Sequence, residues 1–485
     1  MIFGLKNIRN TNRKQTLGID MSFDEQLIQE SLDFAKSKGA DFAEAFCEQT
    51  SSNATSLDEK RIDSRSTGLS KGVGIRVINN SRVGLAYTST LTTKGLQAAV
   101  EAACVSAGVG TNPGGKGIDA NLFRDDSKQK TGDRAQEYRD PAQKTADRLR
   151  EIDDTIRSFD SHIAQAGATI AQSQREVLIM NTAGVNAADT QTRTRCIVQA
   201  IAKNSDTIQT SHEAPGRSVG YEYFDRFDLK DISTIAAKRA ITLLDAIPAP
   251  SGNFPVILKK GAGGVLFHEA CGHGLEADHI EKAQSVFADK VGKRVASDLV
   301  TLVDDGTMSD EWGTYRFDDE GNPSQMNTLI KDGVLQDFMW DVVRANKLGH
   351  DVSGNGRRET YEYLPMVRMT NTYLQPGTST VEDIIASTEY GIYCVALGGG
   401  QVNTVTGEYV FGVTEGYLVE NGKITSPIRG ATLIGNGLET MLNIDAVAND
   451  FDTWTGTCGK NGQGVPVSAG QPTLRVSSMT VGGTA

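Results

Sequence analysis

Hydrophobic residues recur along the first half of the chain at two different spacings. Spacing of three or four residues predicts helices over residues 24–38, 92–107, 141–159 and 229–244. Alternation at every second residue predicts strands over residues 42–47, 72–78, 83–88, 163–172, 176–181, 193–203 and 206–211. Runs of strands with helices grouped beside them favour an α+β fold over a doubly wound sheet. We therefore expect two domains with largely antiparallel sheets and flanking helices.

The second half repeats this mixture after the clearest linker of the chain, residues 248–252 (PAPSG). Its alternating segments predict strands over residues 254–258, 299–304, 366–372, 392–397, 407–413, 416–420 and 423–434. Asn421 and Gly422 have the composition of a two-residue hairpin turn. The pattern divides the chain into three segments, which are a flexible tail at residues 1–20, an N-terminal α+β domain at 21–225 and a C-terminal α+β domain at 226–485.

Composition and charge narrow the functional class. The 485 residues carry a formal net charge of −12, so the chain lacks the basic surface of a nucleic-acid-binding protein. It has no run of about 18 apolar residues and no apolar N-terminal segment of signal-peptide length, so we expect no membrane association. The six cysteines are scattered without a pairing pattern, which is typical of reduced thiols. We therefore expect a cytoplasmic protein.

The clearest candidate for chemistry is the pattern H-E-x-x-x-H, formed by His268, Glu269 and His273. The familiar H-E-x-x-H motif places two imidazoles on one face of a helix, where they bind zinc. Here the spacing is one residue longer, and residues five apart in a straight α-helix point about 140° away from each other. Because Gly272 and Gly274 flank the second histidine, we expect the helix to loosen or end near Gly272 and bring His273 back toward His268. Glu269 would then be the base that activates a water molecule at the metal.

Two histidines need a further protein ligand to complete a catalytic metal site. The candidates are Cys271, His279, Cys458 or a carboxylate. Cys458 is favoured by its surroundings, because residues 456–464 (GTCGKNGQG) form a polar, glycine-edged loop instead of an apolar run. Cys271 lies inside the helical pattern, and we expect it to face the packing side. A thiolate together with two imidazoles favours zinc over other divalent ions.

Three motifs, in this order along the chain, resemble those of the TldD/PmbA family. The first is the H-E-x-x-x-H pattern itself. The second and third are formed by residues 354–358 (GNGRR) with 365–372 (PMVRMTNT), and by 458–467 (CGKNGQGVPV) with 471–475 (QPTLR). Weaker similarity at residues 39–44 (GADFAE) and 72–77 (GVGIRV) extends the resemblance over nearly the whole chain.

The resemblance implies a zinc metallopeptidase of the catalytic, TldD-type branch that hydrolyses unstructured, extended peptides. By the same resemblance, His268, His273 and Cys458 bind one Zn²⁺ per chain, and Glu269 is the catalytic glutamate. The sister TldE/PmbA branch typically lacks these residues, whereas this chain has all of them. Family members work as dimers, so the resemblance also implies either a homodimer or a heterodimer with a TldE/PmbA-like chain.

Two further features are candidates for binding a peptide substrate. Gly398, Gly399 and Gly400 follow a predicted strand, where exposed main-chain groups could pair with an extended peptide. A flexible turn is the alternative. Arg357, beside Arg358 in a glycine-flanked loop, could bind a carboxylate bidentately. A structural ion pair is the alternative for either arginine.

A second functional class has to be weighed against a peptidase. The chain could be a non-catalytic regulatory or peptide-binding protein with a structural zinc, in keeping with the family's older label as a modulator of DNA gyrase. A closed site with four protein ligands, for instance with Cys271 or His279 added, would support that class. Glu269 discriminates between the two classes, because a structural site has no need of a free carboxylate beside a ligand.

Overall fold

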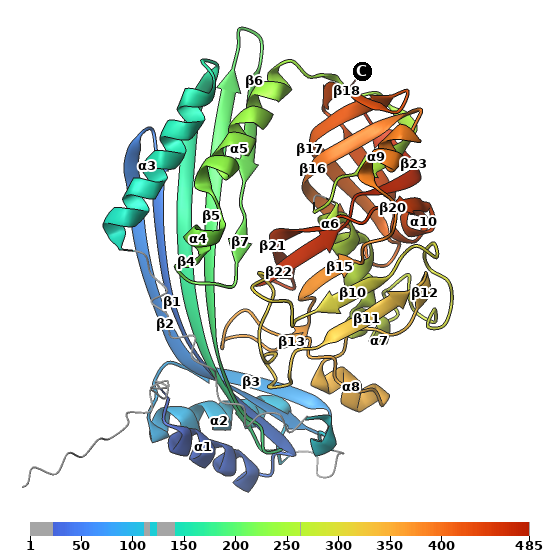
Figure 1. Cartoon of the computed structure of the whole chain (residues 1–485). Coiled ribbons are helices and arrows are strands. Elements are labelled where there is room, and N and C mark those ends of the chain that lie inside the picture. Colours follow the sequence, from blue (N-terminus) through green and yellow to red (C-terminus); the bar gives the residue numbers. More distant parts are fainter. Residues whose placement is uncertain (1–22, 111–116, 124–140, 262, 485) are drawn as a thin grey trace, which may run out of the picture.

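The computed structural model describes residues 23–110, 117–123, 141–261 and 263–484, so the predicted tail at residues 1–20 lies outside the described part. The first part of the chain forms a seven-stranded antiparallel sheet in the order β3-β2-β1-β4-β5-β6, with β7 paired to β5 (Figure 1). Its strands are β1 (Phe42–Asp58), β2 (Arg61–Asn79), β3 (Arg82–Thr88), β4 (Ile163–Asn181), β5 (Asn186–Lys203), β6 (Ile208–Glu213) and β7 (Gly216–Arg217).

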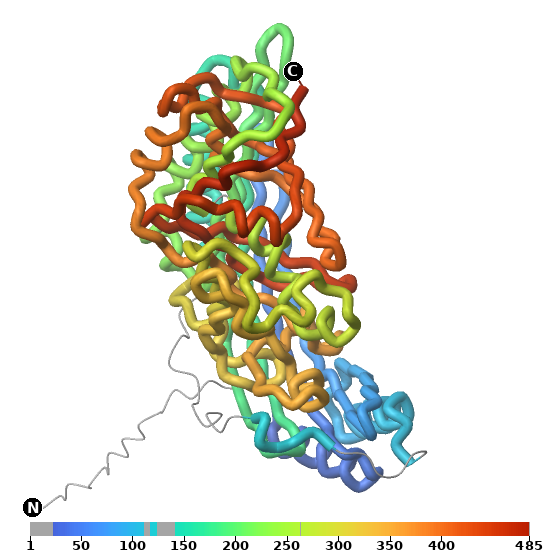
Figure 2. The backbone as a smooth tube through the Cα atoms, turned by 90° about the vertical axis from the view of Figure 1, so that its right-hand side faces the viewer, coloured from blue at the N-terminus to red at the C-terminus, as the bar shows by residue number. Residues whose placement is uncertain are grey.

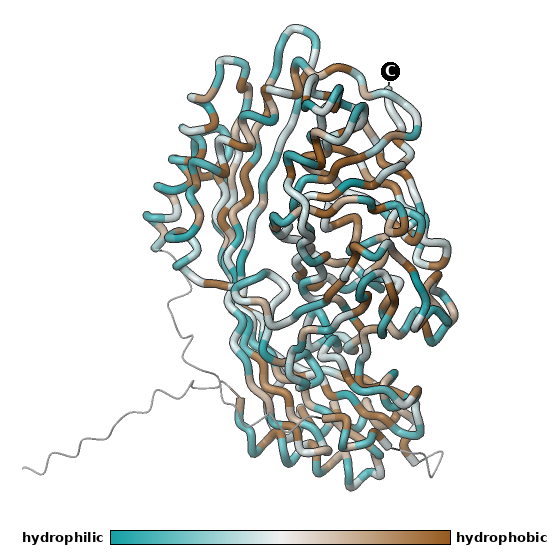
Figure 3. Tube along the Cα trace, turned by 45° about the vertical axis from the view of Figure 1, so that its right-hand side comes forward, coloured by the Kyte–Doolittle hydropathy of each residue, from teal (hydrophilic) through white to brown (hydrophobic). Residues whose placement is uncertain are grey.

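The length of β1, β2, β4 and β5 is the main departure from the predicted elements. Alternation predicted a strand that ends at residue 47, but β1 continues through the polar residues 48–56 (EQTSSNATS) to Asp58. Main-chain pairing to β2 on one side and β4 on the other holds this stretch in the sheet, although it lacks an apolar face. Figure 3 shows teal, hydrophilic stretches between brown ones along these strands. Hydrophobic alternation therefore finds only the strand segments that pack against helices.

Two pairs of helices cover one face of this sheet, at opposite ends of the long strands (Figure 1). The helices are α1 (Glu25–Ser37) with α2 (Thr93–Ala107), and α3 (Ala142–Phe159) with α5 (Leu229–Leu244). On β4, Ala168 packs in the core of one pair and Met180 in the core of the other. Because these two residues have the same parity along the strand, both helix pairs lie on the same face. All four helices were predicted within one residue at each end.

The second part of the chain contains two larger sheets and one short one. An eight-stranded sheet has the order β16-β9-β23-β19-β17-β18-β8, with β20 paired to β23, and a six-stranded sheet has the order β12-β11-β10-β15-β22-β21. The strands of the eight-stranded sheet are β8 (Ile247–Pro248), β9 (Gly252–Leu258), β16 (Tyr390–Val402), β17 (Glu408–Glu420), β18 (Lys423–Arg429), β19 (Thr432–Asn436), β20 (Ile444–Val447) and β23 (Leu474–Gly482). Those of the six-stranded sheet are β10 (Leu302–Asp305), β11 (Met326–Lys331), β12 (Val334–Leu335), β15 (Asn371–Leu374), β21 (Asp452–Lys460) and β22 (Gln463–Gln471).

The remaining elements of the second part are short. They are β13 (Gly356–Arg357) paired with β14 (Met366–Val367), and the helices α6 (Gly264–Phe267), α7 (Ala277–Glu281), α8 (Val342–Leu348), α9 (Val381–Ala386) and α10 (Gly437–Leu442). Three strand pairs, β8 with β18, β9 with β16 and β15 with β22, are parallel, and the others are antiparallel. The predicted α+β class with largely antiparallel sheets is confirmed. Within the described residues, no helix is both long and apolar enough to cross a bilayer.

The chain passes from the first sheet to the second after α5. Before that point, the short helix α4 (Tyr223–Arg226) follows β7. Helix α5 packs on β5 and beside α3, burying Ala236 and Ala240 in the core that these elements share. The predicted division at residue 226 assigned α5 to the second domain, and that division stays a prediction. Figure 2 shows the helices α1 and α2 and the C-terminal strands at opposite ends of an elongated molecule.

Candidate metal centre

The two histidines lie on a widened helical turn that joins two short helices. Helix α6 continues into a π-helical turn, η2 (His268–Gly272), and then into a 3₁₀ turn, η3 (His273–Leu275). The His273 N–H donates to the carbonyl of His268, five residues earlier. In a turn closed by such bonds, residues five apart stack as residues four apart do in an α-helix. Both imidazoles therefore lie on the same face of the turn.

This geometry corrects where the helix was expected to loosen. The sequence predicted a change near Gly272, but the widening begins at His268 and includes the whole stretch between the histidines. Gly272 keeps a right-handed helical conformation, with φ −54° and ψ −51°. Its role is close packing, because a Cβ at this position would lie 2.0 Å from Sδ of Met369. A glycine is therefore required here by a neighbouring side chain and not by a left-handed backbone.

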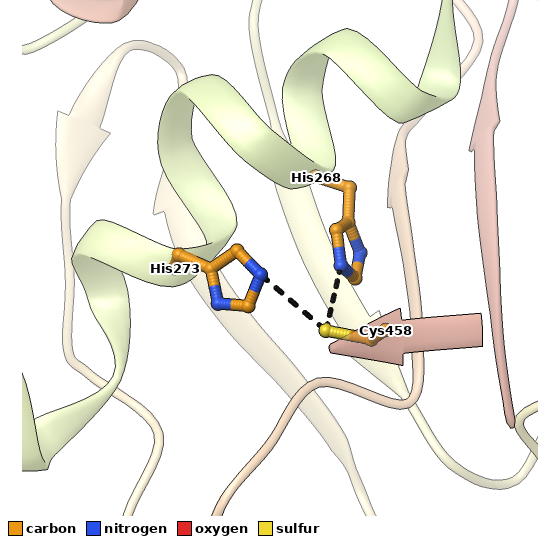
Figure 4. A group of neighbouring side chains, drawn as sticks. All are labelled: His268, His273 and Cys458. Atoms are coloured by element: carbon orange, nitrogen blue, oxygen red, sulfur yellow. Dashed lines mark hydrogen bonds between the residues drawn. The ribbon is translucent and has the colours of Figure 1, made fainter. Parts of the chain in front are cut away.

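Cys458 approaches the same face of η2 from the edge of the six-stranded sheet. The segment predicted as a loop is a hairpin of β21 and β22, turned at Asn461 and Gly462, both of which have positive φ. Sγ of Cys458 lies 3.2 Å from Nε2 of His268 and 3.3 Å from Nε2 of His273 (Figure 4). All three side chains are buried, and the three donor atoms lie within 4.8 Å of one another.

The surroundings of Cys458 favour its thiolate form. Burial alone raises the pKa of this thiol, but the imidazoles of His268 and His273 outweigh that effect and lower the pKa to about 4. The pKa of a buried cysteine without such neighbours is raised instead. Burial raises the pKa of Cys196 and of Cys394 to about 12. The thiol at the centre is therefore chemically distinct from the packed thiols of the same chain.

Glu269 lies at the side of this cluster. Its Oε2 atom is 3.8 Å from Nε2 of His273, and its side chain is 24% exposed, compared with 9% for the side chain of His273. Glu269 is thus the member of the predicted site that reaches solvent. A partly exposed carboxylate beside two buried imidazoles is an arrangement that can support general-base chemistry.

Two charged residues that sequence analysis missed lie behind His273. Glu276 accepts a hydrogen bond from Nδ1 of His273 at 2.9 Å and another from Nζ of Lys460 at 2.8 Å, both at Oε2. Lys460 also donates to Asp278 at 2.7 Å. A sequence signal did exist, because Glu276 follows His273 by three residues and Lys460 follows Cys458 by two, on the same side of a strand.

Cys271 and His279, the other candidate ligands, do not join the cluster. Sγ of Cys271 lies 3.0 Å from Sδ of Met441, on the packing side where it was expected. Nε2 of His279 lies 3.8 Å from Oε2 of Glu276 and belongs to the charged group behind His273. The donors that converge are two imidazole nitrogens and one thiolate. This donor set fits a zinc ion with an open fourth position.

The two candidate peptide-binding features have different surroundings. Gly398, Gly399 and Gly400 lie in β16, which packs against η2, and Gly399 and Gly400 are exposed. The guanidinium of Arg357 is instead buried, and it donates to the carbonyls of Met369 at 2.5 Å and Pro466 at 2.8 Å. These two bonds join main-chain segments, and a role of Arg357 in binding substrate stays a prediction.

Comparisons with known proteins agree with the geometry. Three consecutive family models match the chain, namely PmbA/TldA metallopeptidase domain 1 at residues 43–107, the central domain at 135–244 and the C-terminal domain at 251–483. The Metalloprotease TldD homolog of Haemophilus influenzae is 37% identical over 480 residues, which cover 97% of this chain and 98% of that protein.

Solved structures show the same fold at lower sequence identity. TldE from Thermococcus kodakarensis has a TM-score of 0.77 at 19% identity, covering 94% of this chain and 99% of that one. A putative modulator of a DNA gyrase from Thermotoga maritima has a TM-score of 0.76 at 20% identity, covering 94% of this chain and 100% of that one. The matches to all three family models and to a relative of nearly equal length together show that the chain belongs to the PmbA/TldD family of metallopeptidases.

Proposed function

We propose that this chain is a zinc-dependent peptidase that hydrolyses extended, unstructured peptides. The observation that carries the proposal is the convergence of Nε2 of His268, Nε2 of His273 and Sγ of Cys458 beside the partly exposed carboxylate of Glu269. These three residues would hold one Zn²⁺ per chain. A bound zinc ion supplies a Lewis acid that polarises a carbonyl group and lowers the pKa of water.

The residues around the metal have separate roles in this proposal. With zinc bound, Cys458 would supply a thiolate and the two imidazoles would supply neutral nitrogen donors. Glu269, which touches solvent, accepts a proton from the attacking water and passes it to the leaving amine. The curated relative named as a metalloprotease supports peptide-bond hydrolysis as the reaction class.

Strand β16 supports an extended peptide as the substrate. Among the described strands, β9 pairs with β16 only up to Cys394, and residues 396–402 of β16 pair with β17 on one edge only. A Cβ added at Gly399 would meet no atom within 4 Å. A peptide strand added to this edge would be held by main-chain hydrogen bonds, with little demand on its sequence. Strand β16, which carries this edge, also packs against η2.

We also propose a partner chain and a location. The partner is a second copy or a TldE/PmbA-like sister chain, as the family resemblance implies, and the likeness to the Thermococcus TldE fold is compatible with it. All six cysteines are free thiols, which supports a reducing compartment such as the cytoplasm.

The test measures zinc content by elemental analysis together with cleavage of an unfolded peptide. Glu269→Gln should keep zinc and lose cleavage, because only the proton acceptor is removed. Cys458→Ala should lose both zinc and cleavage. Glu362→Gln changes an exposed glutamate in the same chemical way and should alter neither property.

The same experiment distinguishes a catalytic zinc site from a structural one. A regulatory protein with a structural zinc would bind metal, and its Glu269→Gln variant would match the wild type in every assay. Wild-type protein that holds zinc but cleaves nothing, even with a TldE/PmbA-like chain added, would favour that second class. Absence of zinc in protein purified without chelators would refute the proposed metal site.

A further inference from the structure

The carboxylate of Glu276 is held rigidly behind His273. Its main chain is extended, with φ −85° and ψ 126°, and it forms a parallel bridge with Met339. The N–H of Met339 donates to the carbonyl of Leu275, and the N–H of Ala277 donates to the carbonyl of Met339. These bonds fix the backbone on both sides of Glu276. The buried side chain therefore turns back toward His273 from a fixed point.

The ammonium group of Lys460, on the facing strand β21, is also fixed by hydrogen bonds. Its Nζ donates to Glu276 at 2.8 Å, to Asp278 at 2.7 Å and to the carbonyl of Val367 at 3.2 Å. These three bonds use all three protons of an ammonium group. Lys460 is on the same strand as Cys458, two residues later, so both side chains leave the same side of β21. The lysine thus ties the cysteine strand to the histidine turn.

We propose that Glu276 and Lys460 form a clamp that positions His273 and Cys458 for metal binding; this inference rests on the proposed function. Glu276 accepts the hydrogen bond from Nδ1 of His273, which fixes the tautomer that leaves Nε2 free for the metal. Lys460 holds Glu276 in that position and sets the distance between the two chain segments that carry the ligands.

Only one of the two histidines is oriented by the clamp, because Nδ1 of His268 differs from Nδ1 of His273 in its hydrogen bonding. Nδ1 of His268 is buried and has no hydrogen-bond partner among the described residues. The ring of His268 is therefore oriented by packing, whereas a charged acceptor orients the ring of His273. Glu276 and Lys460 do not reach the open side of the cluster, so they are positioning residues and not catalytic ones.

The contacts of Lys460 also explain why a second group of side chains, spaced like metal ligands, does not require a metal ion. Glu276, Asp278 and His279 have donor atoms within 4.8 Å of one another, as a metal site would. Nζ of Lys460, however, lies within hydrogen-bond distance of both carboxylates. The ammonium group already supplies the positive charge between them. We therefore expect one zinc ion per chain and not two.

The test compares Glu276→Gln and Lys460→Met with Asp278→Asn in the full-length protein. Asp278 accepts a hydrogen bond from Lys460 and, within the described part of the chain, has none with His273, so Asp278→Asn is the matched control. Zinc affinity is measured by competition with a chelator, and the ligand field by the visible spectrum of the Co²⁺-substituted protein. Glu276→Gln should weaken zinc binding by about 10- to 100-fold and shift the cobalt bands, since partners of ligating histidines have effects of this size.

The results for Lys460→Met and Asp278→Asn can either support or overturn the clamp. Lys460→Met should weaken zinc binding less than Glu276→Gln, and Asp278→Asn should leave both readouts unchanged. If Glu276→Gln does not fold, as judged by circular dichroism of the metal-free protein, Lys460→Met decides the question alone. Equal affinity in wild type and in the folded clamp variants would overturn the inference, and so would a loss in Asp278→Asn as large as in Glu276→Gln.

Failure of the clamp can be told apart from failure of the proposed function. If the wild type binds zinc and cleaves peptide while Glu276→Gln binds zinc equally well, the clamp alone is wrong. If Glu276→Gln weakens zinc binding but no form of the protein cleaves peptide, the clamp stands and the peptidase proposal fails. If the wild type binds no zinc, both are overturned.

Discussion

Two buried charged clusters of this protein use their charges in opposite ways. In the first, which we call the interdomain network, Arg76 bonds to Glu44 at 2.5 Å and to Glu320 at 2.6 Å, and Arg358 bonds to the second oxygen of Glu44 at 2.6 Å. Every carboxylate in these bonds faces an arginine. The network joins β1 and β2 to loops of the second part, and its side chains are at most 1% exposed.

The candidate metal centre is also buried, but its donor atoms face one another. His268, His273 and Cys458 direct two imidazole nitrogens and a sulfur at a common region, with a partly exposed carboxylate beside it. Burial of ionisable groups is therefore a poor guide to function by itself. The difference lies in the kind of groups that meet, because the network pairs opposite charges whereas the cluster brings together three atoms that can all bind the same cation.

The largest effect is expected when one ligand of the cluster is removed. Zinc sites contribute an apparent ~10–16 kcal/mol, so loss of one of three protein ligands should cost about 4–5 kcal/mol of zinc binding, more than about 1,000-fold. We expect this for His268→Ala, measured by chelator competition. His350→Ala is the matched control, because the ring of His350 stacks on Trp340 outside the cluster. Wild-type affinity in His268→Ala would contradict the assigned ligand set.

The interdomain network should show the opposite response. Arg358→Met leaves one oxygen of buried Glu44 without its cation, and we expect about 3–4 kcal/mol of destabilisation in chemical unfolding, with zinc affinity unchanged. Arg150→Met is the control, since Arg150 pairs with Asp147 on the surface, where both side chains are more than half exposed. It should leave the unfolding midpoint unchanged. A loss of zinc in Arg358→Met would remove the distinction between the two clusters.

The clamp behind His273 should make stability depend on pH. Burial alone raises the pKa of Glu276, but Lys460 and His273 lower it further than burial raises it, below its ordinary 4.5. The stabilisation from Glu276 is therefore complete above pH 4.5 and is lost progressively as pH falls below that value. Burial alone lowers the pKa of His273, yet Glu276 and Cys458 raise it well above 6.5, so its contribution is complete below pH 6.5 and is lost at higher pH.

The opposite pH dependences of the Glu276 and His273 contributions define the pH range in which both are complete. In metal-free protein, the difference in thermal midpoint between wild type and Glu276→Gln should be largest between pH 4.5 and 6.5 and should shrink on both sides. Thermal unfolding at closely spaced pH values checks this. A difference that is constant from pH 3 to pH 9 would show that Glu276 acts without its charge.

The smallest effect is expected at Cys271, which is close to the ligands in sequence but not in space. Cys271→Ala removes a contact with Met441 and should cost about 1 kcal/mol of stability without changing zinc affinity. Denaturant titration and chelator competition give the two quantities. Loss of zinc in this variant would instead indicate a closed, structural site.

Sequence reasoning predicted the parts of this molecule in which local pattern and final structure agree. The helices α1, α2, α3 and α5 have an apolar stripe that packs on a sheet, so periodicity found them. Periodicity did not find the polar middle of β1, because that stretch is held by pairing with its neighbours and not by an apolar face.

At the candidate metal centre, sequence reasoning was also limited, because the geometry depends on segments that are distant in the sequence. The spacing of His268 and His273 showed that a straight helix could not bring them together, and only the structure shows the π-helical turn that does. Glu276 and Lys460 were missed because a charged residue at an unremarkable position looks solvated in a sequence. Their partnership is visible only once the β21–β22 hairpin is placed beside η2.

The separation of the cluster along the chain has a consequence for synthesis. Cys458 follows His268 by 190 residues and lies on β21, in the hairpin that only β23 follows among the described strands. A ribosome reaches Cys458 only 190 residues after it has added His268. A nascent chain that stalls or is cut short before that point carries the histidines without the thiolate. Such a fragment lacks one donor of the candidate metal site, so it should not bind metal as the intact cluster does.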